Sequence, residues 1–363
     1  MLENITKTTL LVDKDIAIRN IIKMKDKAEN AGAVFRPHFK THQSGLIGEW
    51  YRNLGIEKIT VSSVAMAQYF ALHGWRDITL AFPVNLREIS SINEIIKSTK
   101  INLLIESIEV ADKLEASLSQ SVDVFIKIDC GAHRAGISID NPNEILSLAN
   151  HISKKKHLHL SGFLTHAGQT YLTTSPVEIA DIASTTAHKL QKLKVVLNDP
   201  ELVLSWGDTP SCSMIEGLKD FDEWRPGNFV FYDVMQFHIG SCGLDDVAVA
   251  MACPVVAMHQ KRNQLVIYGG AIHFSKEHIV ADNGFRLFGY VVPLTDNGWG
   301  QPISGAWLSS ISQEHGVVQL PPHTTELFHP GDLIGILPVH SCLTISAMQE
   351  MISLSGEFIP CMK

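Results

Sequence analysis

The feature that most constrains the fold of this chain is an alternation of strand-like and helix-like segments before residue 240. Eight short apolar runs are separated by segments whose apolar residues recur at helical spacing. This alternation is typical of parallel strands joined by crossover helices, and eight units favour a (β/α)8 barrel. An open doubly wound sheet stays an alternative, because periodicity does not show closure. The predicted strands are 34–40, 58–63, 77–82, 101–107, 122–129, 157–165, 202–207 and 228–233, and the predicted helices are 15–31, 65–73, 86–97, 108–118, 142–152 and 177–197.

Beyond residue 240 the pattern changes to short β-rich runs separated by turn residues, without a long amphipathic helix. This part predicts a mainly β domain, to which the opening run 8–12 contributes a strand. A length of 363 residues suits one large barrel plus a smaller module. We therefore predict a barrel domain at 13–240 and a β domain at 241–363 together with 1–12.

Composition narrows the class of protein. The net charge is −8 and no run of lysine or arginine occurs, which argues against a nucleic-acid partner and for a small-molecule one. The longest uncharged apolar stretch, 247–258, contains Pro254 and is too short to cross a membrane. The N-terminus does not resemble a signal peptide, and the six cysteines are scattered without a CxxC pair. We expect a cytoplasmic enzyme with reduced cysteines and no membrane contact.

Lys40 ends the first predicted strand in an unusual setting. In an extended segment Arg36, His38 and Lys40 share one face. Neighbouring positive charge and partial burial favour an uncharged amine, as a lysine needs before it forms a Schiff base with a carbonyl. The same cluster would attract an anionic cofactor. The alternative is a strand end that carries surface basic residues into a loop.

Polar motifs recur at the ends of the predicted strands, where a parallel barrel gathers its functional loops. Surface polarity without a function would not follow strand ends so consistently, so this pattern favours a functional Lys40. The motifs are Lys40 after the first strand, Asp129 and Arg134 after the fifth, His166 and Tyr171 after the sixth, 207–213 after the seventh, and Tyr232 with Asp233 at the eighth.

Two loops are candidates for binding a phosphate. Gly207, Asp208 and Thr209 join a buried strand to a predicted helix, where glycine allows close approach and free amides favour an anion. The same residue types are also ordinary turn and N-cap residues. The turn containing Gly227 and Asn228 is the second candidate, and loops seven and eight are the usual phosphate position in such barrels.

Further side chains suit a bound ligand. Arg134 presents a planar, permanently charged fork to a phenolate or carboxylate oxygen, although a loop arginine can also pair with a surface acid. His166 and Tyr171 can orient or protonate a ligand, although either can be structural. In an extended segment His340 and Cys342 would point the same way and offer nitrogen and sulfur to Zn²⁺. Two protein ligands suit a catalytic zinc with open positions rather than a structural one.

Taken together, the ordered motifs resemble the D-serine dehydratase and D-threonine aldolase family. These are pyridoxal 5′-phosphate (PLP) enzymes of fold type III, with a barrel similar to that of alanine racemase and a C-terminal β domain. The resemblance covers essentially the whole chain. It rests on 36–42, Lys127-Ile128-Asp129 with Gly131 and Arg134, His166-Ala167-Gly168 with Tyr171, Gly207-Asp208-Thr209-Pro210, Gly227-Asn228, Tyr232-Asp233, Gln313-Glu314-His315-Gly316 and His340-Ser341-Cys342.

The resemblance implies roles for these residues. Lys40 is the Schiff-base lysine, and Arg134 lies beside the cofactor ring. The predicted catalytic residues are Lys40, His38 and Tyr171, the predicted cofactor-binding residues are Lys40, Arg134, His166, Tyr171, Gly207, Asp208, Thr209, Gly227, Asn228 and Tyr232, and the predicted metal ligands are His340 and Cys342.

The implied activity is PLP- and zinc-dependent dehydration of a β-hydroxy-D-amino acid such as D-serine, D-threonine or 3-hydroxyaspartate, by a homodimer. Aldolase members tend to carry aspartate where Cys342 stands, so a metal-dependent D-threonine-type aldolase is the second expectation. A racemase is more distant, because no motif supplies the second-base tyrosine of alanine racemases. A non-catalytic PLP-binding protein is equally distant, because that class lacks the C-terminal domain.

Overall fold

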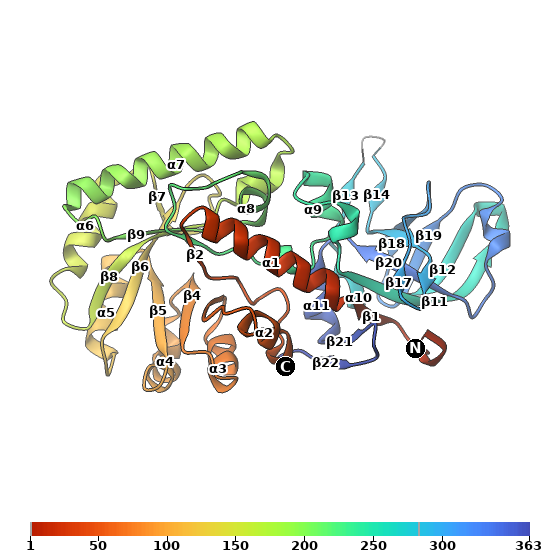
Figure 1. The fold of residues 1–363 in the computed structure, drawn as a ribbon, viewed down its shortest axis with the longest axis horizontal. Helices are drawn as coiled ribbons and strands as arrows, with labels where there is room; N and C mark the ends of the chain where they lie inside the picture. Colours follow the sequence, from red (N-terminus) through yellow and green to blue (C-terminus); the bar gives the residue numbers. More distant parts are fainter. Residues whose placement is uncertain (1, 282–283) are drawn as a thin grey trace. The chain divides into compact units, whose positions relative to one another are not determined.

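A computed structural model describes residues 2–281 and 284–363 (Figure 1). The chain forms two compact units, and each is built from segments that are discontinuous in sequence. The barrel unit comprises Ile22–Lys40 and Gly48–Gly227, and the β unit comprises Met1–Ile21, Thr41–Ile47 and Asn228–Lys363. The predicted domain limits of 13–240 and 241–363 with 1–12 remain a proposal.

The barrel unit contains eight parallel strands in the order β2-β10-β9-β8-β6-β5-β4-β3, with the short β7 beside β6. A bridge between His38 and Thr60 joins the two ends of this order. Phe39 N–H donates to Thr60 O at 2.8 Å, and Thr60 N–H donates to Pro37 O at 2.9 Å. The predicted (β/α)8 barrel is thus confirmed. Its strands are β2 (Val34–Phe35), β3 (Lys58–Val61), β4 (Asp77–Pro83), β5 (Lys100–Ile105), β6 (Val122–Asp129), β7 (Ile137–Ser138), β8 (Leu158–Thr165), β9 (Val203–Trp206) and β10 (Glu223–Trp224).

The eighth strand lies elsewhere than predicted. Segment 228–233 forms a 3-10 turn at Asn228–Val230 and leads into helix α9 (Val234–Ile239), whereas the strand is β10, five residues earlier. Glu223 and Trp224 pair with both β9 and β2. The apolar run after Asn228 is buried, but burial alone does not distinguish a strand from a short helical segment.

The first strand is shorter than predicted, and its charged residues do not share one environment. Arg36 lies inside the barrel, where Nε donates to Glu223 at 2.5 Å and Nη1 donates to Asp77 at 2.6 Å. Beyond Arg36 the backbone pairing continues past Pro37, with His38 N–H donating to Pro226 O at 2.8 Å. Arg36 itself belongs to a buried ion-pair network with Asp77 and Glu223.

Helices α3 to α7 lie outside the strands (Figure 1). Their starts follow ordinary capping rules, since the hydroxyls of Ser63, Ser107 and Ser175 accept backbone N–H groups of α3, α5 and α7. The helices that include residues of this unit are α1 (Lys14–Asn30), α2 (Gly45–Arg52), α3 (Val64–Leu72), α4 (Ile89–Ile95), α5 (Ile108–Ser117), α6 (Pro142–Ile152), α7 (Pro176–Leu197) and α8 (Thr209–Met214).

The β unit is a mostly antiparallel sheet in the order β12-β19-β18-β15-β20-β11-β1-β21-β22. Because β11 also pairs with β12, the strands from β12 to β11 close into a barrel. Strand β1 pairs with β11 and β21, which confirms the strand predicted at 8–12. The strands are β1 (Thr9–Val12), β11 (Val249–His259), β12 (Gln264–Tyr268), β15 (Gly289–Val292), β18 (Trp307–Ile311), β19 (His315–Gln319), β20 (Leu333–Pro338), β21 (Glu350–Ser353) and β22 (Phe358–Pro360), and the unit also contains helices α9, α10 (Ala271–Phe274) and α11 (Ser341–Met348).

Two further expectations can be compared with the structure. All six cysteines are thiols rather than disulfides. Within residues 2–281 and 284–363, no helix combines the length and the hydropathy that crossing a membrane requires.

Candidate active site

Phe39, the residue before Lys40, is tightly packed at the end of the first strand. The Phe39 ring is fully buried against Tyr51, Phe70 and Trp75, with ring centroids 4.9, 4.9 and 5.0 Å away. The Lys40 side chain itself is exposed, so the partial burial that we predicted is wrong. The packing fixes the backbone at this point, while the amine reaches out of the core.

A cluster of cationic groups surrounds His38. Burial lowers the His38 pKa well below its usual value, and the positive charges of Lys40, Arg225 and Arg134 add to that effect. The Lys40 N–H donates to His38 Nδ1 at 3.3 Å, and the His38 N–H donates to Pro226 O at 2.8 Å. The structure therefore brings together residues that follow the first, fifth, sixth and eighth strands, as the barrel prediction requires.

His166 is a hydrogen-bond acceptor toward a ligand rather than an acid. Its Nδ1 contacts Gly207 O, and because a carbonyl can only accept, Nδ1 carries the proton. Burial, with the charges of Lys40 and Arg134, lowers the His166 pKa to about 3. At neutral pH the ring is uncharged and its Nε2 offers a lone pair, so His166 can orient a ligand but cannot donate a proton from an imidazolium.

Arg225 is a site residue that sequence reasoning missed. It is buried, its Nε donates to Ser205 Oγ at 2.6 Å, and its Nη2 donates to Thr165 O at 2.5 Å. Burial lowers its pKa to about 10, so it stays charged at neutral pH. A Cβ on Gly207 would lie 2.9 Å from this guanidinium, so residue 207 has to be glycine. Arg225 directly precedes the turn that contains Gly227 and Asn228, and an arginine at the end of a predicted buried segment was the available signal.

The predicted phosphate loop fits an oxyanion. Asp208 accepts from Ser211 N–H at 2.6 Å and from Thr170 Oγ1 at 3.1 Å, and burial raises its pKa to about 6. Thr209 N–H donates to the Tyr171 hydroxyl at 3.3 Å. Thr209 Oγ1 is buried and has no hydrogen-bond partner among the described residues. Because buried hydroxyls are normally paired, this orphan is what a bound phosphate oxygen would satisfy.

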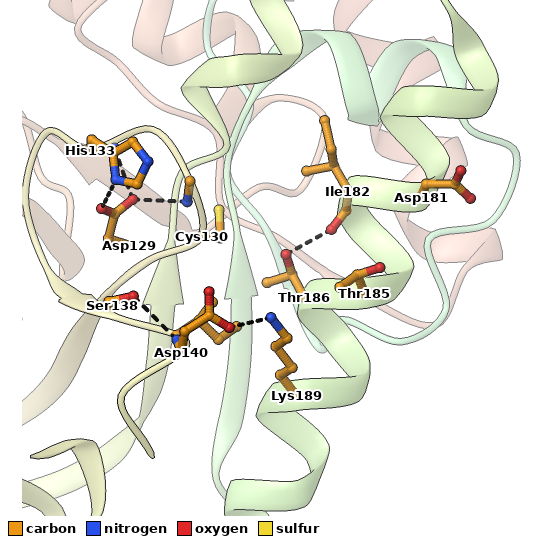
Figure 2. A pocket seen from close by; sticks show the side chains of 12 residues that line it. Asp129, Cys130, His133, Ser138, Asp140, Asp181, Ile182, Thr185, Thr186 and Lys189 are labelled. Atoms are coloured by element: carbon orange, nitrogen blue, oxygen red, sulfur yellow. Dashed lines mark hydrogen bonds and ion pairs between the residues drawn. The ribbon is translucent and has the colours of Figure 1, made fainter. Parts of the chain in front are cut away.

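The loop after β6 is shaped by Asp129. Its carboxylate accepts from the N–H groups of Gly131 and His133, both at 3.0 Å, and contacts His133 Nδ1 at 3.2 Å. Figure 2 shows this pair at the edge of a cavity of about 410 Å³, with the ion pair of Asp140 and Lys189 on its other side. None of the predicted cofactor residues lines this cavity, so Asp129 serves to set the loop that carries Arg134.

In the β unit, His340 and Cys342 lie next to each other, but not in an extended segment. His340 is the N-cap residue of α11, and Cys342 lies in the first turn of that helix. Burial by itself would lower the His340 pKa, but a hydrogen bond with Cys342 and the negative charges of Cys342 and Asp233 raise it to about 9. The extended geometry that we predicted is thus wrong, although the two side chains still meet.

This pair fits a divalent metal such as zinc. His340 Nδ1 is buried and has no hydrogen-bond partner in the described part of the chain, and a nitrogen beside a thiol is a donor set that zinc accepts. Among residues 2–281 and 284–363, no group of three or more His, Cys, Asp or Glu is arranged to hold a metal. His340 and Cys342 would therefore leave the remaining positions to water or substrate.

Asn228 and Tyr232, predicted to bind the cofactor, also lie in the β unit. The Asn228 side chain is directed at the metal pair, since Nδ2 lies 2.6 Å from Asp233 Oδ2 and 3.6 Å from Cys342 Sγ. Tyr232 has φ of 47°, a left-handed conformation that is rare for a bulky residue and is often found at functional sites. Gly227 is the last residue of the barrel unit.

A buried histidine near the predicted metal pair makes the β unit sensitive to acid. Burial lowers the His42 pKa to about 3. As pH falls below about 6.5 the unfolded chain binds a proton that folded His42 does not, so the unfolding free energy should fall by about 2 kcal/mol between pH 7 and 5. Between these two pH values the loss of unfolding free energy, measured by urea unfolding, should be about 2 kcal/mol smaller in His42→Leu than in the wild type, because His38 and His166 contribute equally in both proteins. An equal pH dependence in both proteins would contradict the assignment.

Comparison with known proteins matches both units. Residues 12–234 match the family described as "Alanine racemase, N-terminal domain", and residues 248–354 match the "Putative serine dehydratase domain". The chain is 27% identical to a D-serine dehydratase of Dictyostelium discoideum, an alignment that covers 96% of this chain and 93% of that protein. It is also 27% identical to the D-threo-3-hydroxyaspartate dehydratase of a Delftia species, over 92% and 90% of the two chains.

Solved structures agree on the fold. The Delftia dehydratase superposes with a TM-score of 0.92 at 24% identity, over 99% of this chain and 98% of that one. A D-threonine aldolase from Filomicrobium marinum superposes with a TM-score of 0.84 at 19% identity, over 99% and 96%. An alanine racemase domain implies PLP as the cofactor. The resemblance seen in the sequence is thus confirmed, and the chain belongs to the family in which an alanine racemase N-terminal domain is combined with a serine dehydratase domain.

Proposed function

We propose that the protein is a PLP- and zinc-dependent dehydratase that converts a β-hydroxy-D-amino acid into a 2-oxo acid and ammonia. The candidate substrates are D-serine, D-threonine and 3-hydroxyaspartate. The observation that carries this proposal is the contact of Cys342 with His340 and with Thr41, whose Oγ1 lies 3.3 Å from Cys342 Sγ. Thr41 directly follows the predicted Schiff-base lysine in the sequence.

The proposal assigns tasks to the residues of the barrel unit. Lys40 removes the Cα proton, Arg134 holds an anionic oxygen in place, and His166 accepts a hydrogen bond without changing charge. When bound, PLP withdraws electrons from the Cα of the substrate, and zinc acts as a Lewis acid at the β-oxygen. Because hydroxide is a poor leaving group, elimination needs such an acid.

Relatives support the metal assignment. The Delftia dehydratase has solved variants in which a histidine and a cysteine, two positions apart, are each replaced by alanine, and the cysteine variant is described as metal-free. His340 and Cys342 have the same spacing here. We infer that this pair holds the metal, with Tyr171, Asp208 and Thr209 near the cofactor phosphate.

A metal-dependent aldolase is the second candidate. The chain is 26% identical to a 3-hydroxy-D-aspartate aldolase of Paracoccus denitrificans, over 62% of this chain. The same metal pair could lower the pKa of the β-hydroxyl, and its deprotonation would break the Cα–Cβ bond. Cys342 favours the dehydratase, because aldolases tend to carry aspartate at that position. A cytoplasmic homodimer remains part of the proposal, and light scattering of the purified protein would test the dimer.

The products distinguish the two reactions. Purified protein with PLP, zinc and D-serine or D-threonine should yield ammonia together with pyruvate or 2-oxobutyrate. D-threo-3-hydroxyaspartate should yield ammonia and oxaloacetate. The L-enantiomers serve as matched controls and should not react. Formation of glycine with acetaldehyde or glyoxylate would overturn the dehydratase in favour of the aldolase.

A further inference from the structure

Asp233 is a buried carboxylate at the start of α9 that no predicted role uses. Its side chain is 1% exposed. Oδ1 accepts from Gln236 N–H at 2.9 Å and caps the helix. Oδ2 faces the segment of the predicted metal pair, so one carboxylate joins the start of α9 to the start of α11.

Oδ2 of Asp233 accepts hydrogen bonds from Ser341, the residue between the two predicted metal ligands. It accepts from the N–H of Ser341 at 2.9 Å and from Ser341 Oγ at 3.2 Å. Ser341 stands between His340 and Cys342 in the sequence. Fixing the main chain of Ser341 therefore also restrains the backbone from which the two ligand side chains extend. Hydrogen bonds to a carboxylate are stronger than neutral ones, and these are buried.

Asp233 also fixes the orientation of an amide that faces the sulfur. Asn228 Nδ2 lies 2.6 Å from Asp233 Oδ2 and 3.6 Å from Cys342 Sγ. A carboxylate can only accept, so it keeps the NH₂ group on this side. Asn228 Oδ1 is then left buried without a partner among the described residues. Because buried polar atoms are normally paired, the Asp233 carboxylate is needed to keep the NH₂ group, and not this oxygen, beside the sulfur.

We propose that Asp233 is a positioning residue for the metal pair. It holds the Ser341 backbone between His340 and Cys342, and it directs the Asn228 N–H toward the sulfur, where it stabilises a thiolate. The proposal rests on the proposed function, because it presupposes that His340 and Cys342 bind a metal. Partners of this kind commonly change metal affinity by about 10–100-fold.

Cobalt binding to the full-length, PLP-loaded protein tests this role. Cobalt(II) replaces zinc and gives an absorption band when a thiolate binds it. Asp233→Asn leaves one acceptor oxygen where the carboxylate has two, so it cannot accept from Gln236 and from Ser341 with Asn228 at the same time. We therefore expect cobalt affinity, measured against a competing chelator, to fall about 10–100-fold. At saturating cobalt the thiolate band should also be shifted or weakened, which a general loss of stability would not produce.

Asp13→Asn is the matched control. Asp13 belongs to the same unit, and its Oδ1 accepts from the N–H groups of Asp15 and Ile16 at the start of α1. This variant loses a carboxylate at a helix start but should bind cobalt as the wild type does. If Asp233→Asn does not fold, Asn228→Ala is the second variant, because it removes the amide that Asp233 directs at Cys342 and leaves the carboxylate in place. We expect it to weaken cobalt binding and to change the thiolate band.

The outcomes separate the two proposals. If the wild type gives no thiolate band with cobalt, the metal part of the proposed function fails, and the role of Asp233 fails with it. If the wild type binds cobalt through a thiolate, but Asp233→Asn and Asn228→Ala match its affinity and spectrum, only the role of Asp233 is overturned. Weaker cobalt binding and a changed thiolate band in these two variants, with wild-type behaviour in Asp13→Asn, support the role of Asp233.

Discussion

Replacing Lys40 by alanine should abolish the covalent attachment of PLP to the protein. Lys40 is the predicted Schiff-base lysine, and it stands beside Arg134, His166 and Arg225 around His38. The variant should lose the visible absorption of lysine-bound PLP, and its kcat should fall by at least about 10²- to 10⁴-fold, the usual contribution of a catalytic base. Absorption spectra and the release of 2-oxo acid measure both effects.

Lys127 is the rival that the experiment has to exclude. It is buried in the barrel, burial lowers its pKa to about 8, and its Nζ donates to Ile128 O at 2.7 Å. On its pKa alone it is a plausible nucleophile. Borohydride reduction of the PLP-loaded wild type, followed by peptide mapping, should place the label on Lys40, and Lys127→Met should still bind PLP covalently. A label on Lys127 would contradict the assignment of Lys40.

Replacing Cys342 by alanine should remove the metal and the elimination activity together. With only His340 left as a protein ligand, zinc affinity should fall by more than about 100-fold, beyond the usual effect of outer-sphere partners. The PLP absorption should remain, because Lys40, the predicted point of covalent attachment, lies in the barrel unit and is unchanged. Metal analysis after gel filtration, together with 2-oxo acid production, measures this loss.

Chelation provides the complementary test. Removal of metal from the wild type should stop elimination, and added zinc should restore it, whereas zinc should not rescue Cys342→Ala. Cys242→Ala is the matched control, because Cys242 is a half-buried thiol of the same unit. Unchanged turnover after complete chelation would exclude the metal from the reaction.

The barrel could be predicted from sequence because its signal is repeated many times. Long helices such as Pro142–Ile152 and strands such as Val122–Asp129 coincide with their predicted limits. Strand β10 was missed because two residues are too few to show any periodicity, while the apolar run after Asn228 imitated a strand. The prediction also omitted helix α2 (Gly45–Arg52), so the errors in the fold include one helix of eight residues as well as the shortest elements.

The candidate site was harder to predict, because its chemistry depends on contacts between distant residues. Lys40 and Cys342 could be named as candidate site residues from the sequence. The exposure of Lys40 and the helical setting of Cys342 could not be predicted from it. Arg225 and Asp233 looked like ordinary turn and cap residues. Their importance is visible only once Ser205, Ser341 and Asn228 are seen to contact them.

The place of β1 in its sheet has a consequence for synthesis on the ribosome. Thr9–Val12 emerges well before its neighbours β11 and β21, which begin at Val249 and Glu350. At about 5–20 residues per second, the nascent strand waits roughly 15 to 70 s for the second neighbour. During that time the apolar residues of β1 lack at least one of their two native sheet neighbours. Chaperone supply and translation speed should therefore govern the yield of soluble protein more than the final stability does.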